Sequence, residues 1–492
     1  MSKKVILVYP SHTKGWEIQP WVDIPLGLLY CATPLERAGY DVTILDQRLE
    51  PQWQRLLEKE LKDRPICVGM STTTGPQLRH ALEVSRFIKK HTDVPVVWGG
   101  VHPSILPQQT LAEECVDIVV EGEGEETFFE LVQALEKNKP LAKIKGLWYK
   151  NNHDILHTET RALIDLNQQP PLSWHLIKPR QYIKSVFGLE RLSFSASRGC
   201  PNRCAFCFNV TFYKRRWRRL DPALIVERLK DYVTLYKIKG IFLTDSNFFV
   251  DINWARQVLS GIISQNLNIA LTRIHICFDS LTRLTDQDFE LLEKAGCRCL
   301  AVGIESGSER IRGLLHKEID ENRLLELNRK LSQYPFLMIY FFMVGFPTET
   351  KEELRQTVKL FSRLLAENPK AAKSVSIYTP FPGTELFDLA IKEGLAVPQC
   401  TKDWAGFNYR SSLPSSHWQT KKMTQLVEMV DFCSFFIGSH SYLNPFKKTR
   451  SWAVLMSRLY APLAQKRLDN LFGRFPVEIK LAKLLGLFAK QE

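Results

Sequence analysis

The sequence predicts an α/β protein: a doubly wound, Rossmann-like N-terminal domain, then a partial (β/α)6 barrel of the TIM type, then a helical C-terminal region. Two observations support this fold class. β-Branched runs alternate with amphipathic stretches from about residue 5 to 134 and again from 192 to 379, which is typical of parallel strands connected by helices. The 492 residues also suffice for two or three domains of roughly 150 residues each. We expect the N-terminal domain at 1–140, a connector at 141–190, the barrel at 191–390 and the C-terminal region at 391–492.

The first region contains five candidate strands, at 5–9, 42–46, 66–70, 94–98 and 118–120. In a doubly wound sheet, ligands bind outside the carboxyl ends of the strands, and three of these ends are rich in small or hydrogen-bonding residues. They are Ser71 and Thr72 after the third strand, Gly99, Gly100 and His102 after the fourth, and Gly122, Glu123, Gly124 and Glu125 after the fifth. Because the same residue types suit plain turns and helix caps, the sequence alone leaves both interpretations open.

The second region contains six candidate strands, at 192–196, 240–244, 269–277, 300–304, 337–344 and 375–379. Amphipathic stretches such as 222–236 and 351–365 separate them. Six β/α units are fewer than the eight of a closed barrel, so they predict an open or partial one. The alternation ends near residue 390.

The composition indicates a folded protein of the cell interior. Apolar residues make up 45% and charged residues 24% of the chain, which are ordinary values for globular domains. No apolar run is long enough for a membrane-spanning helix, and the N-terminus lacks the pattern of a secretion signal. We therefore expect a cytoplasmic location.

The net charge of +13 is concentrated near the end of the chain, since residues 441–492 carry more than half of the excess. A basic amphipathic helix is predicted at 476–488. It suits peripheral contact with the inner membrane surface, or a cap packed on the barrel with a charged outer face.

The strongest local motif is the C-x3-C-x2-C loop formed by Cys200, Cys204 and Cys207, directly after the first barrel strand. Three thiolates in eight residues can hold a 4Fe-4S cluster and leave one iron open. A structural zinc site would need a fourth ligand nearby, and the next cysteine along the chain is Cys277. Eleven cysteines at irregular spacing also favour a reducing compartment over a disulfide framework.

The cysteine loop at 197–209 and the strand-end segments 303–308, 343–350 and 380–385 resemble those of the radical S-adenosylmethionine (SAM) enzymes. The resemblance implies that the open iron binds SAM, which is then cleaved to a 5′-deoxyadenosyl radical. It also implies that Glu305 and Ser306 hold part of SAM. Asp245, at the end of the second barrel strand, is expected to face the same mouth of the barrel.

The N-terminal region is similar to the cobalamin-binding domain that precedes the barrel in one class of these enzymes. The match lies in 25–30 and 35–40 and in the loops at 99–103 and 121–125. This class contains methyltransferases and an anaerobic oxidative cyclase, so the implied cofactors are the 4Fe-4S cluster, SAM and cobalamin. The Asp-x-His-x-x-Gly motif that supplies a cobalt ligand in other cobalamin proteins is absent. We therefore expect cobalamin to bind without a protein histidine on cobalt.

The resemblance favours methylation of an unactivated carbon or phosphorus of a small molecule, through a 5′-deoxyadenosyl radical and methylcobalamin. An alternative is a radical cyclase or carbon–carbon bond-forming enzyme acting on a porphyrin or lipid. A third alternative, ranked after the cyclase, is a transfer-RNA methylthiotransferase. The expected partners are a small-molecule or lipid-like substrate and an electron donor such as flavodoxin or ferredoxin. No general acid or base is singled out.

A basic segment at 214–219 has the composition of a nucleic-acid patch. It lies seven residues after the cysteine loop, however, and leads into a predicted helix. That position favours either a clamp on a carboxylate or phosphate of a cofactor or a solvated helix face, so we do not expect nucleic acid as a partner.

Overall fold

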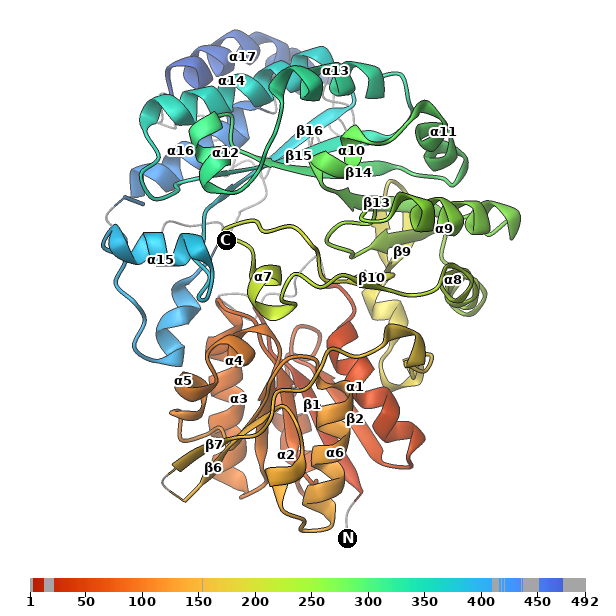
Figure 1. The fold of residues 1–492 in the computed structure, drawn as a ribbon, viewed down its shortest axis with the longest axis vertical. Helices are drawn as coiled ribbons and strands as arrows, with labels where there is room; N and C mark the ends of the chain where they lie inside the picture. The colour runs from red at the N-terminus through yellow and green to blue at the C-terminus, as the bar shows by residue number, and fades with distance from the viewer. Residues whose placement is uncertain are drawn as a thin grey trace.

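The computed structural model describes residues 3–12, 22–152, 154–408, 416, 418–419, 421–434, 436 and 451–471. Within them, the chain forms two seven-stranded sheets and one two-stranded ribbon. Figure 1 shows the first sheet and its helices at one end of the molecule, in red and orange, and the second sheet toward the other end, in green and cyan. The predicted order of a doubly wound domain, a partial barrel and a helical region is confirmed.

The N-terminal sheet has the strand order β2-β1-β3-β4-β5-β6-β7. Its strands are β1 (Lys4–Tyr9), β2 (Asp41–Asp46), β3 (Val68–Ser71), β4 (Val96–Gly99), β5 (Ile118–Val120), β6 (Leu147–Asn151) and β7 (Asp154–His157). The first five run parallel, whereas β6 and β7 form an antiparallel hairpin on the edge of β5. This hairpin lies in the segment expected to be a connector, and it covers a strand edge that would otherwise be unpaired.

Helices cover both faces of this sheet. They are α1 (Leu26–Arg37), α2 (Trp53–Leu61), α3 (Gln77–His91), α4 (Val101–Ile105), α5 (Pro107–Leu111) and α6 (Gly124–Glu136). In β1, Val5 and Leu7 belong to one hydrophobic cluster, while Ile6 and Val8 belong to another. Successive strand side chains point to opposite faces, so a continuous apolar run such as this one is buried on both sides.

The second sheet has the order β16-β15-β14-β13-β12-β9-β8, with six parallel strands from β9 to β16 and an antiparallel β8 at one edge. Its strands are β8 (Lys184–Val186), β9 (Leu189–Phe194), β12 (Gly240–Leu243), β13 (Ala270–Ile276), β14 (Cys299–Glu305), β15 (Leu337–Val344) and β16 (Ala371–Ile377). The helices between them are α8 (Pro222–Tyr236), α9 (Ile252–Ser264), α10 (Phe278–Thr282), α11 (Asp286–Lys294), α12 (Glu309–Leu314), α13 (Glu321–Leu331) and α14 (Lys351–Glu367). The cysteine loop crosses between the two domains with α7 (Phe208–Phe212) and the ribbon of β10 (Ser197–Arg198) and β11 (Arg218–Arg219).

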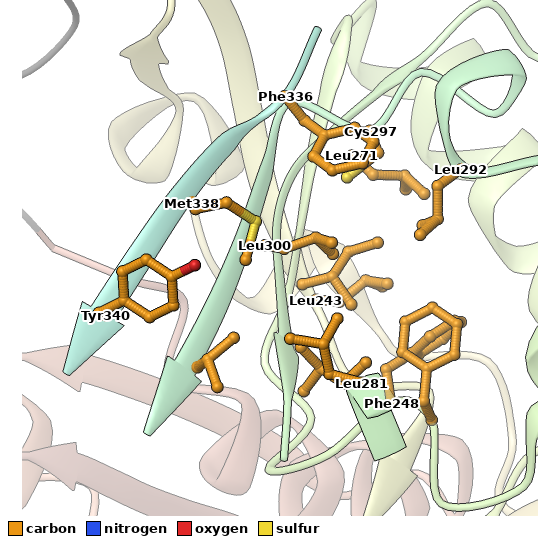
Figure 2. Packing of buried hydrophobic residues seen from close by; sticks show 14 of the residues in the cluster. Leu243, Phe248, Leu271, Leu281, Leu292, Cys297, Leu300, Phe336, Met338 and Tyr340 are labelled. Carbon is orange, nitrogen blue, oxygen red and sulfur yellow. The ribbon is translucent and has the colours of Figure 1, made fainter. Parts of the chain in front are cut away.

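The helices pack on one face of this sheet through alternate strand residues. Figure 2 shows Leu300, Met338 and Tyr340 converging with side chains from the neighbouring strands and helices. Their immediate neighbours Cys299, Ala301, Leu337 and Ile339 form a separate cluster. This alternation leaves the other face of the sheet to line the interior of the partial barrel.

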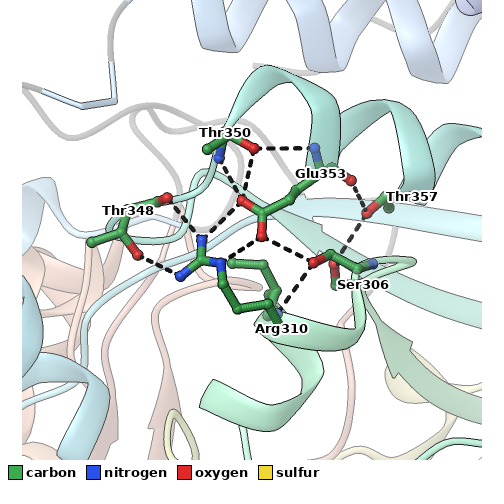
Figure 3. Close-up of polar contacts among 8 residues, drawn as sticks. Ser306, Arg310, Thr348, Thr350, Glu353 and Thr357 are labelled. Carbon is green, nitrogen blue, oxygen red and sulfur yellow. Dashed lines mark hydrogen bonds and ion pairs between the residues drawn. The ribbon is translucent and has the colours of Figure 1, made fainter.

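The loops after β14 and β15 are locked together by the first turns of α14 (Figure 3). Arg310 donates to both carboxylate oxygens of Glu353, at 2.7 and 2.8 Å, and the hydrogen bond from Arg310 helps lower the pKa of Glu353 to about 2. One turn later, the Thr357 hydroxyl lies 3.1 Å from the Ser306 hydroxyl and accepts from the Gly307 N–H at 2.9 Å. The strand-end loop is therefore fixed from behind.

The segment after the barrel returns to the N-terminal domain. It contains α15 (Glu385–Lys392) and the 3-10 helix η5 (Thr401–Gly406) and lies along one side of both domains in Figure 1. Trp404 is buried in the N-terminal core, and its indole N–H donates to Gln109 Oε1 at 2.6 Å. The amide of Gln109 in turn donates to the carbonyl of Pro398 at 2.9 Å. This strap ties the N-terminal domain to the end of the barrel.

Two further helices follow, α16 (Lys421–Ser434) and α17 (Ser451–Asn470), and both contact the barrel. The basic helix predicted at 476–488 lies outside the described residues. Among the helices that the structure describes, none combines the length and the apolar character required to cross a bilayer.

Candidate functional site

A cavity of about 350 Å³ lies between the two domains. One wall is formed by the carboxyl ends of β3, β4 and β5 in the N-terminal sheet, and the other by the cysteine loop and the ends of β9 and β12. Seven of the residues proposed from the sequence line it: Ser71, Gly99, Gly100, Gly122, Glu123, Gly124 and Glu125. The strand ends singled out in the sequence therefore converge on one space.

The N-terminal wall of the cavity is open because several of its residues lack side chains. A Cβ added at Gly27 would meet only the Ser71 hydroxyl, at 3.9 Å, and one added at Gly122 would meet nothing within 4 Å. Aromatic rings cover the opposite wall, where Phe208, Phe212 and Tyr213 lie. A flat, largely apolar group with polar edges fits such a space.

A buried ion-pair cluster closes one end of the cavity and joins the two domains. Arg198 donates to Glu123 Oε1 at 2.9 Å and contacts Glu125 Oε1 at 2.7 Å. Arg218 donates to Glu123 Oε2 at 2.7 Å, and the backbone N–H of Ile164 donates to the same oxygen at 3.1 Å. Burial raises the pKa of Glu123, but the two arginines outweigh burial and hold it below its ordinary value. Glu123 is thus an ionised link between the domains.

Two residues expected at the site lie behind the cavity wall. His102 is fully buried, its Nδ1 lies 3.0 Å from the Thr74 hydroxyl, and its ring packs against Trp404. Burial lowers the pKa of His102 to about 3, so the ring is neutral. Thr72 is also fully buried, and its backbone N–H donates to the carbonyl of Gly99 at 2.8 Å. Both support the loops that line the cavity.

The cysteine loop begins at a backbone position that requires glycine. Gly199 has φ of 83°, and a Cβ there would lie 2.0 Å from the carbonyl oxygen of Arg216. The loop can therefore fold back tightly against the ribbon before Cys200. Among the described residues, no three His, Cys, Asp or Glu side chains converge on a single point suited to one metal ion. A cubane cluster instead takes one cysteine on each iron, so its ligands surround the cluster.

The three loop cysteines have different surroundings. The neighbouring thiol of Cys277, at the end of β13, lowers the pKa of Cys200 to about 7. Burial raises the pKa of Cys204 to about 11 and also raises that of Cys207. All eleven cysteines are free of disulfides. The donor set of Cys200, Cys204 and Cys207 suits the 4Fe-4S cluster expected from the sequence.

A largely buried lysine lies beside the cysteine loop, where Lys317 Nζ is 5.8 Å from the ring centroid of Phe206. Lys317 donates to Glu305 Oε1 at 2.7 Å and to the carbonyl of Gly303 at 2.8 Å. A Cβ on Gly303 would lie 2.3 Å from that Glu305 oxygen and 2.8 Å from the lysine nitrogen, so only glycine leaves room for the pair. Burial lowers the pKa of Lys317, but the charges of Glu305 and Cys204 outweigh burial and raise it. A fixed cation therefore stands next to the candidate cluster ligands.

The predicted residues Asp245 and Ser306 form hydrogen bonds that stabilise loops around the site. Asp245 is buried and accepts hydrogen bonds from the Ser197 hydroxyl and from the N–H of Ala196, the latter at 3.2 Å. Burial raises the pKa of Asp245 to about 6. The Ser306 hydroxyl is fully buried against Thr357 and accepts from the N–H of Ser308 at 3.1 Å. Both residues fix loops that border the candidate cluster and SAM positions.

Sequence reasoning missed three residues that the fold brings to the site: Arg198, Lys317 and Cys277. Arg198 lies inside the cysteine loop at 197–209, but its partner Glu123 is 75 residues away in the sequence. Cys277 follows β13 and could have been found with the strand-end argument that selected Asp245. Lys317 follows Glu305 by 12 residues and had no local signal.

The basic segment at 214–219 is engaged within the chain. Arg218 binds Glu123, and Arg219 donates to Asp251. Both guanidinium groups are therefore paired with carboxylates of the chain itself.

Two protein families match the chain. The B12 binding domain family matches residues 23–132, and the radical SAM superfamily matches residues 194–361. These ranges coincide with the doubly wound domain and with most of the barrel. The cavity lies between the two matched regions.

The chain is also similar to known proteins over most of its length. It is 30% identical over 439 residues to an uncharacterized methyltransferase of Pyrococcus horikoshii, covering 88% of this chain and 92% of that protein. It is 26% identical to an anaerobic magnesium-protoporphyrin IX monomethyl ester cyclase of Synechocystis, covering 87% and 85%. The structure of the radical SAM methyltransferase TsrM from Kitasatospora setae, with cobalamin and a 4Fe-4S cluster bound, superposes with a TM-score of 0.67 at 21% identity, covering 81% and 80%. At 21% identity, the similarity to TsrM concerns the fold alone.

Proposed function

Because the chain belongs to the B12-binding radical SAM enzyme family, we propose that it methylates an unactivated carbon or phosphorus of a small-molecule substrate. The observation that carries this proposal is the cavity between the domains. It brings the carboxyl ends of the N-terminal strands and the cysteine loop to opposite walls of one space. The family's cofactors, a 4Fe-4S cluster, SAM and cobalamin, supply hydrogen abstraction and a methyl carrier when bound.

The residues of this chain have distinct roles in the proposal. Cys200, Cys204 and Cys207 hold the cluster. Lys317 and Glu305 hold the amino acid part of SAM, because an ammonium and a carboxylate pair well with the opposite charges at this position. Ser71 and the glycine-rich strand ends, at Gly99, Gly100, Gly122 and Gly124, form the cradle for cobalamin.

The walls of the cavity contribute by excluding water. Tyr30, Phe208, Phe212 and Tyr213 line it, and the Arg198 guanidinium lies 4.3 Å from the Tyr30 ring centroid. A reactive radical is protected from side reactions only where solvent is kept out and the substrate is held close. The proposed role of the protein is therefore to position and shield.

We expect substitution of Gly27 by leucine to block cobalamin without disturbing the fold. Gly27 lines the cavity, and the only heavy atom that an added Cβ would meet within 4 Å is the Ser71 hydroxyl oxygen, at 3.9 Å. Leucine is the better helix former, so the free energy of unfolding should rise by about 0.5–1 kcal/mol. After anaerobic reconstitution with hydroxocobalamin, the affinity should fall by at least about tenfold, equivalent to about 1.4 kcal/mol.

The matched control is Gly313→Leu. Gly313 also lies in a helix, and a Cβ there meets nothing within 4 Å, but Gly313 does not line the cavity. This variant should bind cobalamin as the wild type does. Undiminished cobalt content in the Gly27→Leu protein would mean that the cradle lies elsewhere.

We expect Lys317→Met to weaken SAM binding while the cluster remains. Loss of a hydrogen bond from a charged group costs about 1.5–3 kcal/mol, or roughly tenfold to a hundredfold in affinity. Calorimetric titration of the reconstituted protein with SAM measures this, and Lys317→Arg should recover part of the affinity. Lys330→Met, which removes an outer lysine paired with Asp286, serves as the control. Equal SAM affinity in Lys317→Met and wild type would refute the assignment.

The proposed reaction is tested with SAM carrying a deuterated methyl group. The reduced, reconstituted enzyme is incubated with candidate small molecules, and the products are analysed by mass spectrometry. A methyltransferase forms a product that contains the deuterated methyl, together with 5′-deoxyadenosine. A cyclase, which the Synechocystis relative makes the second candidate, forms 5′-deoxyadenosine and an unlabelled product that has lost hydrogen.

The enzyme also needs a reductant and a substrate. We propose a low-potential electron donor of the flavodoxin or ferredoxin kind. To test this choice, the reconstituted enzyme is mixed with reduced flavodoxin or ferredoxin. Reduction of the cluster is then measured as a loss of its visible absorption.

A further inference from the structure

One exposed part of the chain has no role in the proposed chemistry. It is the basic turn, which we define as Lys214, Arg215 and Arg216, and all three side chains are exposed. Among the residues that the structure describes, none of the three forms an ion pair. Arg218 and Arg219, which follow the turn, bind carboxylates by contrast. The basic turn therefore presents three uncompensated positive charges to solvent.

The backbone holds this turn in a defined shape. Lys214 and Arg215 have φ of 50° and 59°, and positive values are uncommon for residues other than glycine. The N–H of Arg216 donates to the carbonyl of Tyr213 at 2.9 Å, and the N–H of Arg215 donates to the carbonyl of Asn209 at 3.4 Å. The turn is thus anchored to the end of α7, and its three charges stay together.

The basic turn packs against the start of the cysteine loop. Arg215 Nε donates to the carbonyl of Pro201 at 3.1 Å, and a Cβ on Gly199 would overlap the carbonyl oxygen of Arg216. Arg203, two residues after Pro201, is a further exposed cation that has no ion pair in the described part of the chain. Positive charge therefore gathers at the loop that is proposed to hold the cluster.

The basic turn lies outside the cavity between the domains. Tyr213 lines that cavity, whereas none of the three residues of the basic turn does. Two of the loop cysteines, Cys204 and Cys207, are also partly exposed. A macromolecule bound at the basic turn would therefore lie next to the cysteine loop without entering the cavity.

We propose that the basic turn is the docking surface for the electron donor, an acidic, low-potential electron-transfer protein. In this step one electron leaves the reduced donor and enters the oxidised cluster. Electron transfer slows steeply with distance, so the donor has to bind close to the cysteine loop. Opposite charges on the two proteins would steer it there and fix its orientation. This inference rests on the proposed cluster and donor and is independent of which substrate is methylated.

Nucleic acid is the other class of polyanion that positive charge attracts. Its binding is dominated by contacts with many successive phosphates. The basic turn offers three cations on one short segment, and the arginines that would extend it, Arg218 and Arg219, are already paired. The arrangement therefore favours a protein that presents a compact acidic patch.

The test compares reconstituted wild type with the double variant Lys214→Gln/Arg216→Gln. Arg215 is retained because it also binds the carbonyl of Pro201. At low ionic strength, association of oxidised flavodoxin with the double variant, measured by biolayer interferometry, should be about tenfold slower than with wild type. Added salt should slow association with wild type more than with the double variant, because it screens exposed charges. Bleaching of the cluster by reduced flavodoxin should slow to a similar degree.

The matched control is Lys137→Gln/Lys139→Gln. Both lysines are exposed after the end of α6, form no ion pair among the described residues and lie outside the cavity. This variant also loses two positive charges but should bind flavodoxin as wild type does. Iron content should be equal in all three proteins, and dithionite, a small reductant that needs no docking, should reduce their clusters to the same extent.

The outcomes separate this inference from the proposals on which it rests. If flavodoxin reduces wild type and the Lys214→Gln/Arg216→Gln variant at the same rate, the docking surface lies elsewhere. An equal loss of association in the control variant would show an effect of net charge alone and would also overturn the inference. If the double variant loses affinity only for a single-stranded RNA oligonucleotide, the basic turn serves nucleic acid. Failure of both flavodoxin and ferredoxin to reduce wild type would refute the donor itself, and the inference with it.

Discussion

Replacing Cys200, Cys204 and Cys207 together by alanine should abolish both iron binding and SAM cleavage. Each cysteine supplies the only protein bond to one iron of a cubane cluster, so no partial site remains. The variant should lose the visible absorption of the cluster after anaerobic reconstitution. 5′-Deoxyadenosine should fall below detection, because no other group in the site delivers an electron to SAM.

The control is Cys400→Ala, which removes an exposed cysteine away from the loop. It should retain iron and activity. Circular dichroism of the triple variant should show a folded protein, since the N-terminal core and the outer layer of the barrel do not depend on the loop. SAM cleavage that persists in a folded, iron-free triple variant would refute the cluster assignment.

Substitution of Glu123 by glutamine should destabilise the protein by about 3–5 kcal/mol, because it removes the buried negative charge that two largely buried arginines share. Glu123 has only 4% of its side chain exposed and binds both Arg198 and Arg218. Because Arg198 precedes Cys200 by two residues, cluster retention should also decline. Denaturant unfolding of the reconstituted enzyme and iron analysis measure the two effects.

Glu126→Gln provides the matched comparison on the same segment. Its partner Arg161 lies at 3.0 Å, but 52% of the Glu126 side chain is exposed. Exposed pairs contribute about 0–1 kcal/mol, so this variant should unfold almost as the wild type does. If both variants lost similar amounts of unfolding free energy, the buried ion pairs of Glu123 would have no special role in stability.

We also expect the contribution of the Glu123 carboxylate to folding stability to depend on pH. The pKa of Glu123 is lower in the folded protein than in the unfolded chain. Its contribution to stability is therefore complete above the unfolded pKa of about 4.3 and is lost as the pH falls through the lower folded value. The difference in unfolding free energy between wild type and Glu123→Gln should shrink over that acidic range.

The sequence predicted the parallel strands because their buried apolar runs are a local signal. The predicted strands at 118–120 and 337–344 match β5 and β15 in full. The β6–β7 hairpin was not assigned to the sheet, because all four residues of β7 are exposed and carry no hydrophobic pattern. The strap was missed for another reason: Trp404 meets Gln109 across 295 residues, and no local periodicity reports such a contact.

The outline of the site could also be predicted, because it depends on where the predicted strands end. Strand-end logic identified the cavity wall, since parallel strands present their carboxyl ends to one edge. It selected Glu123, which lines the cavity, but gave no sign that this carboxylate also binds Arg198 and Arg218. Cys277 follows a strand that the sequence predicts, but its closeness to Cys200 depends on the tertiary fold. Roles that depend on charge pairing between domains cannot be predicted from either strand alone.

Metal analysis of the anaerobically reconstituted wild-type protein tests the central claim most directly. In this account, cobalamin occupies the cavity and the cysteine loop that forms one of its walls holds the iron–sulfur cluster, so each chain should contain about four irons and one cobalt. The optical spectrum should show both cofactors. A folded protein that carries zinc at the cysteine loop, or iron with no cobalt, would contradict the account.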